Sequence, residues 1–256
     1  MVILIAVVAF FASLLTLFSG FGLGTILTPV FGLFFPIHVA VALTGIVHLL
    51  NNLFKFTLLG NNVSLPLALR FGIPSVIGGI IGAFILTKLS HLQPLTSWQC
   101  CGKTMEISPL KLVIAVLMIF FALMEIIPAL KTLNFAKRYL TLGGLLSGFF
   151  GGLSGHQGAL RSAFLVNYGL AKEQFIATGV IIACMVDLTR LPVYFSRFQA
   201  QSLLDQWPLL LIATLSAFAG AWIGSRFIKK ITLEIVQKLT AFMIIVIGVL
   251  LSVGVL

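Results

Sequence analysis

Charged residues are scarce in this 256-residue chain, at 9% of the total, and only six residues are acidic. Soluble domains carry about 25% charged residues. Hydrophobic residues make up 60% of the chain and occur in continuous runs, which excludes an ordinary soluble domain and a disordered chain. The alternating hydrophobicity of a membrane β-barrel is missing too. The composition therefore predicts an all-α, polytopic helical membrane protein.

Motifs of enzymes and of cofactor-binding proteins are also missing. The sequence has no His-Glu-x-x-His helix, nucleophile elbow, Walker loop or dinucleotide fingerprint. Its three cysteines, Cys100, Cys101 and Cys184, supply neither a disulfide framework nor the ligand spacing of a zinc site. We therefore expect no catalytic residues, no ATP-driven motor, no metal and no cofactor.

Basic residues give the chain a formal net charge of +10 and lie mainly between the apolar runs. This distribution is typical of membrane-protein loops that follow the positive-inside rule, and not of a nucleic-acid-binding surface. The first charged side chain is Lys55, so the opening apolar run lacks the basic start of a cleaved signal peptide. We expect this first helix to be retained and both termini to lie outside.

Eight apolar segments are long enough, or nearly so, to span a bilayer. They are residues 2–19, 38–59, 67–89, 111–130, 139–154, 174–195, 206–228 and 235–256. Two further apolar segments, 20–36 and 155–170, are interrupted by glycine or proline. As surface loops, they would leave four spans per half and place Lys88 and Arg226 on the same side. As crossing segments, they would give each half an odd number of membrane crossings and place Lys88 and Arg226 on opposite sides. The two halves would then be inverted repeats. The numbers of basic residues on the two sides barely distinguish these topologies. We favour the one in which the broken segments cross the membrane.

Three sequence features recur in the same order in both halves. The matched features are Gly24 with Gly158, Thr44-Gly45 with Thr178-Gly179, and Gly78-x-x-x-Gly82 with Gly220-x-x-x-Gly224. A pair of glycines at this last spacing lets two helices approach closely. We predict two homologous transmembrane repeats, 1–130 and 139–256, joined by a basic linker at 131–138.

The two glycine-rich segments predict an anion site. Non-helical backbone at membrane depth survives only where it is buried in protein or lines a wet cavity. A helix that restarts after the break directs its positive N-terminal end into that space, so two facing breaks would bind an anion without a metal. Tight helix packing without a ligand is the alternative. The expected substrate-binding residues in the breaks are Gly22, Gly24, Thr25, Gly155, His156, Gln157 and Gly158.

Arg161 adds to this prediction because it lies in an apolar stretch just after the second break. An ionisable residue within a membrane segment indicates function by default. Its planar guanidinium suits carboxylate, sulfonate or phosphate oxygens, although an arginine near the interface can also extend to the headgroups. We expect Arg161 to bind the anion and Thr44, Asn51 and Thr178 to line its path.

Two helices carry further polar groups. The first has a polar stripe at helical spacing, made of His48, Asn51, Asn52 and Lys55. In the second, Asp187 and Arg190 are three residues apart and can pair. Interhelical hydrogen bonds and a structural ion pair are the simplest explanations. The functional alternative makes His48 and Asp187 candidates for proton coupling.

The glycine-rich stretches resemble those of the TauE/SafE sulfite exporter family, also called the 4-toluene sulfonate uptake permease family. Members look like two halves, each opening with a glycine-rich stretch that ends in proline. Here the first stretch ends at Pro29, whereas Ala163 replaces the second proline. The resemblance covers nearly the whole chain. It implies a secondary transporter of sulfite, sulfonates, related sulfur oxyanions or small organic acids in a bacterial inner membrane.

The residues predict an anion site between two halves, and the resemblance implies a secondary transporter, an exporter of small sulfur-containing anions. We expect alternating access around a central anion site, with one half rocking against the other. The expected partners are the small anion and the lipid bilayer, with no nucleic acid. An anion channel, a transporter of small carboxylates and a non-transporting membrane scaffold are the alternatives.

Overall fold

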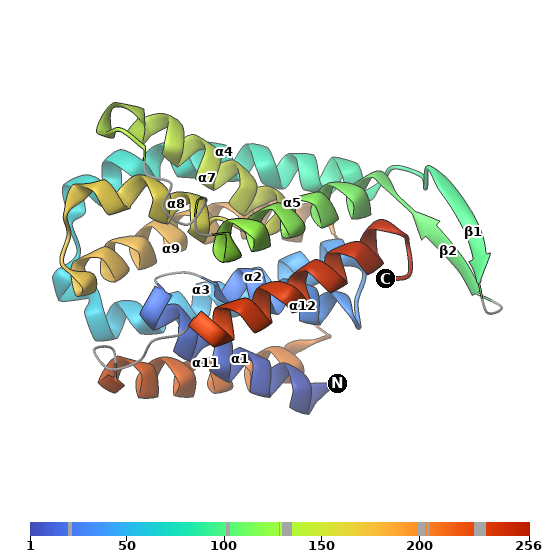
Figure 1. Cartoon of the computed structure of the whole chain (residues 1–256), viewed down its shortest axis with the longest axis horizontal. Coiled ribbons are helices and arrows are strands. Elements are labelled where there is room, and N and C mark those ends of the chain that lie inside the picture. The colour runs from blue at the N-terminus through green and yellow to red at the C-terminus, as the bar shows by residue number, and fades with distance from the viewer. Residues whose placement is uncertain are drawn as a thin grey trace.

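The computed structural model confirms an all-α polytopic membrane protein with one short β-hairpin (Figure 1). The residues that the structure describes are 1–19, 22–100, 103–127, 129, 135–198, 203, 205–227 and 234–256. The α-helices are α1 (Val2–Ser19), α2 (Leu23–Gly32), α3 (Ile37–Leu59), α4 (Leu65–Ser90), α5 (Pro109–Ile126), α7 (Leu140–Ser154), α8 (Gly158–Leu165), α9 (Lys172–Arg197), α11 (Trp207–Phe227) and α12 (Glu234–Ser252). Short 3-10 turns are η1 (Gly60–Asn62), η2 (Lys137–Tyr139) and η3 (Val166–Tyr168).

In their described residues, all eight apolar segments predicted as spans are mainly helical. Four of the described helices, α3, α4, α9 and α11, are long and apolar enough to cross a membrane by length and composition. Local signals set some of the ends. The hydroxyl of Ser108 accepts a hydrogen bond from the Lys111 amide and Pro109 opens α5, which is a favourable helix start. The helix ends at Ile126, and Ile127 is extended because the residue before a proline is disfavoured in helical conformation.

The two broken segments form short helices inside the bundle. Most of α2 is buried, and so are five of the eight residues of α8. Gly22, with φ of 125°, precedes α2, and Gly155, with φ of 82°, follows α7. Only glycine adopts these backbone angles without strain. The prediction of helix breaks is therefore confirmed, and the alternative that made these segments surface loops is wrong.

Helices of one half pack most extensively against helices of the other. The pairs are α4 with α7, α1 with α11, and α5 with α12, while α3 packs on α9. Glycines bring two of these pairs into backbone contact. A Cβ atom at Gly78 would lie 2.0 Å from the Leu145 carbonyl oxygen, and one at Gly220 would lie 2.1 Å from that of Phe10. The predicted role of these glycines in close helix approach is confirmed.

The centre of the bundle is formed by α3 and α9. In their apolar stretches 61% and 67% of the residues are buried, against 44% for α4 and 39% for α11. Both central helices carry the polar residues singled out in the sequence. The fold therefore places these residues in protein and away from lipid, as the cost of lipid-exposed charge requires.

Both chain termini lie at the end of the bundle that carries the hairpin (Figure 1). The hairpin pairs β1 (Thr96–Cys100) with β2 (Lys103–Ile107) in a stretch expected to be only a linker. Trp98 Nε1 donates a 2.8 Å hydrogen bond to the Val253 carbonyl, which joins the hairpin to the C-terminal end of α12.

The direction of the helices tests the two topologies. Because α4 leads into the hairpin, Lys88 lies at the hairpin end. Because α12 runs back to the hairpin, the last turn of α11, with Arg226, lies at the opposite end. These placements agree with the arrangement in which the broken segments carry the chain across. The inverted relation of the halves stays a prediction, and residues 131–134 of the predicted linker lie outside the described residues.

Candidate functional site

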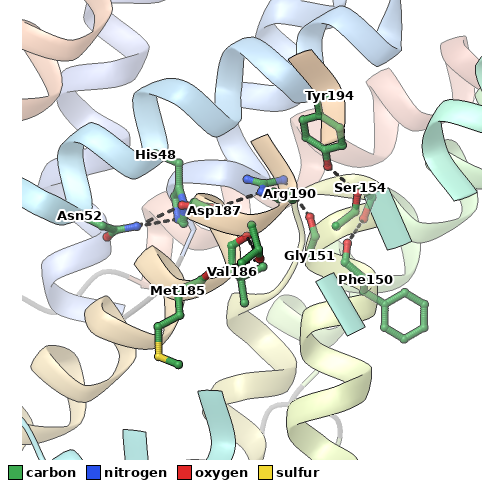
Figure 2. Close-up of polar contacts among 12 residues, drawn as sticks. His48, Asn52, Phe150, Gly151, Ser154, Met185, Val186, Asp187, Arg190 and Tyr194 are labelled. Carbon is green, nitrogen blue, oxygen red and sulfur yellow. Dashed lines mark hydrogen bonds and ion pairs between the residues drawn. The ribbon is translucent and has the colours of Figure 1, made fainter. Parts of the chain in front are cut away.

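A continuous polar network crosses the centre of the bundle (Figure 2). His48 Nδ1 on α3 lies 2.6 Å from Asp187 Oδ2 on α9, and Arg190 Nε donates to Asp187 Oδ1 at 2.9 Å. Asp187 and Arg190 are fully buried. The predicted pairing of Asp187 with Arg190 is confirmed. His48 and Asp187, predicted separately as proton-coupling candidates, are direct partners.

Arg190 also ties α9 to the end of α7. Its Nη1 donates a 2.8 Å hydrogen bond to the Gly151 carbonyl, and the Tyr194 hydroxyl donates to the carbonyl of Gly152. These carbonyls belong to the last turn of α7, just before the break at Gly155. The network therefore connects His48 on α3 to the second helix break through a single buried carboxylate.

A small polar cavity lies beside this network. It is lined by Thr16, Gly22, Leu23, His48, Asn52, Lys55, Arg161, Ile176 and Val180. The described lining residues include the basic side chains of Lys55 and Arg161 and one histidine, and none of them is acidic. Its volume is about 20 Å³ for the centre of a water-sized sphere, which is room for about one water molecule. The cavity is therefore small, and two basic side chains border it.

Lys55 is the charged cavity residue that our sequence-based site did not include. Its side chain is buried, and its ammonium group donates to the hydroxyl of Thr16 at the end of α1. The Asn51 amide, hydrogen-bonded to Ser13, accepts from Lys55 Nζ at 3.2 Å when its NH₂ faces the Ala217 carbonyl. Asn51 therefore braces Lys55 from α3 and does not line the cavity. The i, i+7 spacing from His48 was the sequence signal for Lys55.

The two helix breaks face each other, as predicted. A Cβ atom at Gly24 would lie 2.8 Å from the Gly155 carbonyl oxygen, and one at Gly155 would lie 3.5 Å from Thr28 Oγ1. Gly22 lines the cavity at the start of α2. Thr25, one turn into α2, is buried. The first break therefore borders the cavity directly, with the N-terminal end of α2 beside it.

Each glycine of the repeated Thr-Gly pair packs against a guanidinium. A Cβ atom at Gly45 would lie 3.3 Å from Arg190 Nη2, and one at Gly179 would lie 3.2 Å from Arg161 Nε. The missing side chains leave room for the two arginines against the helix backbone. The recurrence that we noticed in the sequence thus corresponds to a recurring packing of arginine on glycine.

Two threonines expected along the path have different surroundings. Thr44 is buried, and its hydroxyl has no hydrogen-bond partner among the described residues. Thr178 is fully buried and accepts a 3.0 Å hydrogen bond from the Ser64 amide, which precedes α4. Thr178 therefore fixes the start of α4.

The remaining residues of the second break lie away from the cavity lining. His156 is buried and stacks on Phe121 of α5 with ring centroids 5.6 Å apart. The Gln157 carbonyl accepts from the Ser147 hydroxyl, and its buried side-chain amide has no partner within the described part of the chain. Gly158 begins α8, which carries Arg161 to the cavity. Within the described ranges, no group of three His, Cys, Asp or Glu residues could hold a metal ion.

The fold and the site define a class: a polytopic helical membrane protein with helix breaks and buried basic side chains at its centre. The model of the family "Sulfite exporter TauE/SafE" matches residues 5–251. The chain therefore belongs to the TauE/SafE sulfite exporter family, a family of membrane exporters of sulfite and related sulfur anions. No curated protein and no solved structure matches the chain.

Proposed function

We propose that this protein is a secondary transporter that exports sulfite, an organosulfonate or a related small sulfur oxyanion, and not an enzyme. The observation that supports the proposal is the cavity in which Lys55 and Arg161 meet the first helix break at Gly22. A sulfur oxyanion offers several oxygens to these donors. Family membership supports the same class of substrate.

Electrostatics favour an anion in this cavity. Removing a cation from water into the membrane interior is costly unless an opposite charge accompanies it. Lys55 is 3% exposed and Arg161 4% exposed, and both border the cavity. A bound anion would offset the cost of bringing the two cations together. The partly positive N-terminal end of α2 adds to this attraction.

The size of the cavity supports alternating access. Room for about one water molecule does not accommodate a sulfur oxyanion, so the helices around the cavity must separate to admit it. In a channel, the path through such a site opens to both sides at once. In a carrier, it opens to one side at a time. We favour the carrier because the cavity is too small to admit the anion without a rearrangement of the helices.

We further propose a bacterial inner-membrane location with the hairpin and both termini outside. Among the described residues, basic side chains are more numerous at the end opposite the hairpin. The residues at that end are Arg70, Lys137, Arg138, Lys172, Arg226 and Lys238, and those at the hairpin end are Lys88, Lys103, Lys111 and Arg197. The positive-inside rule assigns the more basic end to the cytoplasm.

Thermal stability in detergent tests the anion site. The purified protein is heated with sulfite, thiosulfate, sulfoacetate, taurine, acetate or phosphate. A ligand at 100 times its dissociation constant stabilises the folded state by about 2.7 kcal/mol. We expect a sulfur oxyanion to raise the melting temperature, and Arg161→Gln to weaken its binding about 10-fold or more. Arg70→Gln, at an exposed arginine, is the matched control.

A shift produced only by acetate would replace the proposed substrate class with small carboxylates. An equal shift in wild type and Arg161→Gln would remove Arg161 from the site.

Counterflow in proteoliposomes then distinguishes a carrier from a channel. Labelled substrate should enter faster when unlabelled substrate is present on the other side, and this stimulation should saturate. A flux that lacks such stimulation would make the protein an anion channel.

A further inference from the structure

Lys55 reaches the cavity from α3, but the groups that hold its ammonium come from two helices. The hydroxyl of Thr16, near the end of α1, accepts one hydrogen bond from Lys55 Nζ. The side-chain oxygen of Asn51, one turn earlier on α3, accepts a second at 3.2 Å. All three side chains are buried. The position of the Lys55 ammonium therefore depends on α1 as well as on its own helix.

The Thr16 hydroxyl acts as an acceptor for Lys55 because its own hydrogen is engaged. It donates that hydrogen to the Ser13 carbonyl, 2.7 Å away on the preceding turn of α1. The Thr16 methyl group packs beside the first helix break, with Cγ2 3.6 Å from the place of a Cβ atom at Gly22. A hydroxyl whose hydrogen is engaged has none to offer an anion. Thr16 borders the cavity, yet we expect it to act on Lys55 and not on the anion.

The amide of Asn51 is held by two neighbouring helices. Its NH₂ donates to the Ala217 carbonyl of α11 at 3.2 Å and to the Ser13 hydroxyl of α1 at 2.9 Å. These contacts turn the side-chain oxygen toward Lys55. Asn51 is fully buried and is not among the described residues that line the cavity. It can therefore influence a bound anion only through Lys55.

The hydrogens of Lys55 can be counted. An ammonium group has three. Thr16 and Asn51 accept two of them, and no further hydrogen-bond acceptor for Lys55 occurs within the described part of the chain. The third hydrogen is left for a ligand in the cavity that Lys55 lines. A free lysine side chain would lose rotamer entropy on binding, and two fixed acceptors reduce that loss.

We propose that Thr16 and Asn51 are positioning residues that direct the remaining hydrogen of Lys55 toward the anion. This inference rests on the proposed anion site. It makes the affinity of the site depend on α1, which supplies Thr16 and Ser13, and on α11, which supplies the Ala217 carbonyl. A movement of these two helices away from α3 withdraws the acceptors and lowers the affinity.

Thiosulfate binding to substituted proteins tests the proposal. Dissociation constants are measured by calorimetric titration of the full-length protein in detergent, and melting temperatures are measured without anion. Thr16→Val replaces the hydroxyl with a methyl group of similar shape, and we expect it to weaken binding about 10-fold. Thr16→Ser keeps the hydroxyl and should restore nearly wild-type affinity.

The matched control is Thr87→Val in α4. Thr87 is also buried, and its hydroxyl makes the same kind of hydrogen bond, to the Phe84 carbonyl three residues earlier. It is not among the described lining residues of the cavity. Both valine substitutions should lower the melting temperature, and only Thr16→Val should lower the affinity. An equal loss of affinity in Thr87→Val would show a general effect of destabilisation and would overturn the proposal.

A double-mutant cycle with Lys55 separates positioning from direct contact. Lys55→Met should weaken binding by about 10- to 100-fold. Adding Thr16→Val or Asn51→Leu to Lys55→Met should weaken it no further, because both residues act through Lys55. If Thr16→Val has the same effect with and without Lys55, Thr16 contacts the anion itself and the positioning role is wrong.

Asn51→Leu decides the matter if Thr16→Val does not fold or if Lys55→Met binds too weakly to measure. Since Asn51 lies outside the cavity lining, weaker binding in this variant supports positioning, and wild-type affinity overturns it. A wild type that binds thiosulfate or sulfite, with Thr16→Val and Asn51→Leu binding equally well, leaves the anion site intact and removes the positioning. If neither anion binds the wild type, the anion site fails and the positioning with it.

Discussion

Arg161 and Arg190 share a packing arrangement but have different surroundings. Both are buried, and each lies against the glycine of a repeated Thr-Gly pair. Arg190 is bound to the Asp187 carboxylate and the Gly151 carbonyl. Arg161 borders the cavity with Lys55. The comparison teaches that Arg190 joins α9 to the end of α7, whereas Arg161 borders the cavity that we propose binds the anion.

Replacing Arg190 should have the largest effect on stability. Arg190→Met leaves the Asp187 carboxylate buried with only His48 as partner, and it frees the carbonyl at the end of α7. Removing one member of a buried ion pair costs about 3–5 kcal/mol. We expect a large fall in melting temperature in detergent and a loss of folded protein in the membrane. Arg197→Met, at an exposed arginine on the same helix, is the control.

Adding Asp187→Asn to Arg190→Met should restore part of the stability, since the unpaired charge is then removed. A melting temperature of Arg190→Met equal to that of Arg197→Met would show that the ion pair does not hold the bundle together.

The cavity arginine should behave differently. Arg161→Met leaves the Asp187–Arg190 pair and the contact with the Gly151 carbonyl in place, so we expect a smaller loss of stability without anion than in Arg190→Met. Stabilisation by sulfite or thiosulfate should be lost. Melting curves with and without anion measure both effects at once. A fall in stability as large as that of Arg190→Met would contradict the distinction between the two arginines.

Substitutions at Gly45 and Gly179 should have the smallest effects, and each should affect a different property. Gly45→Ala would place a Cβ atom 3.1 Å from Leu191 Cδ2 and close to Arg190. We expect a loss of about 1 kcal/mol in stability and unchanged anion affinity. Gly179→Ala would instead displace Arg161 by a few tenths of an ångström, which should lower affinity by about 3-fold at nearly unchanged stability. Melting temperatures and anion titrations distinguish these outcomes, and the reverse pattern would contradict them.

The helical segments were readable from the sequence because length and continuous hydrophobicity determine which segments can span a bilayer. The breaks were readable because glycine clusters interrupt those runs. The hairpin at 96–107 was not predicted, since it depends on a strand pairing between two polar stretches and on a hydrogen bond from Trp98 to the distant Val253. Long-range contacts of this kind leave no local pattern.

For the site, the sequence indicated which buried residues are polar, and the fold decided which of them meet. Arg161 was identified from its apolar context, and Asp187 with Arg190 from helical spacing. The contact of His48 with Asp187 joins residues 139 positions apart, so no spacing rule predicts it. Asn51 and Lys55 are on one stripe, yet only Lys55 reaches the cavity. The register between the packed helices determines which of the two side chains faces the cavity.

The glycine contacts between the halves also determine which parts of the protein can move. Where α4 and α7 meet at Gly78, and α1 and α11 at Gly220, the backbones touch. Sliding at such contacts would drive backbone atoms into one another. Each pair should therefore move as one rigid body composed of helices from both halves, and hinges belong at Gly22 and Gly155. A covalent cross-link between α1 and α11 should then leave the transport rate unchanged. A cross-link that bridges the two helix breaks should abolish transport.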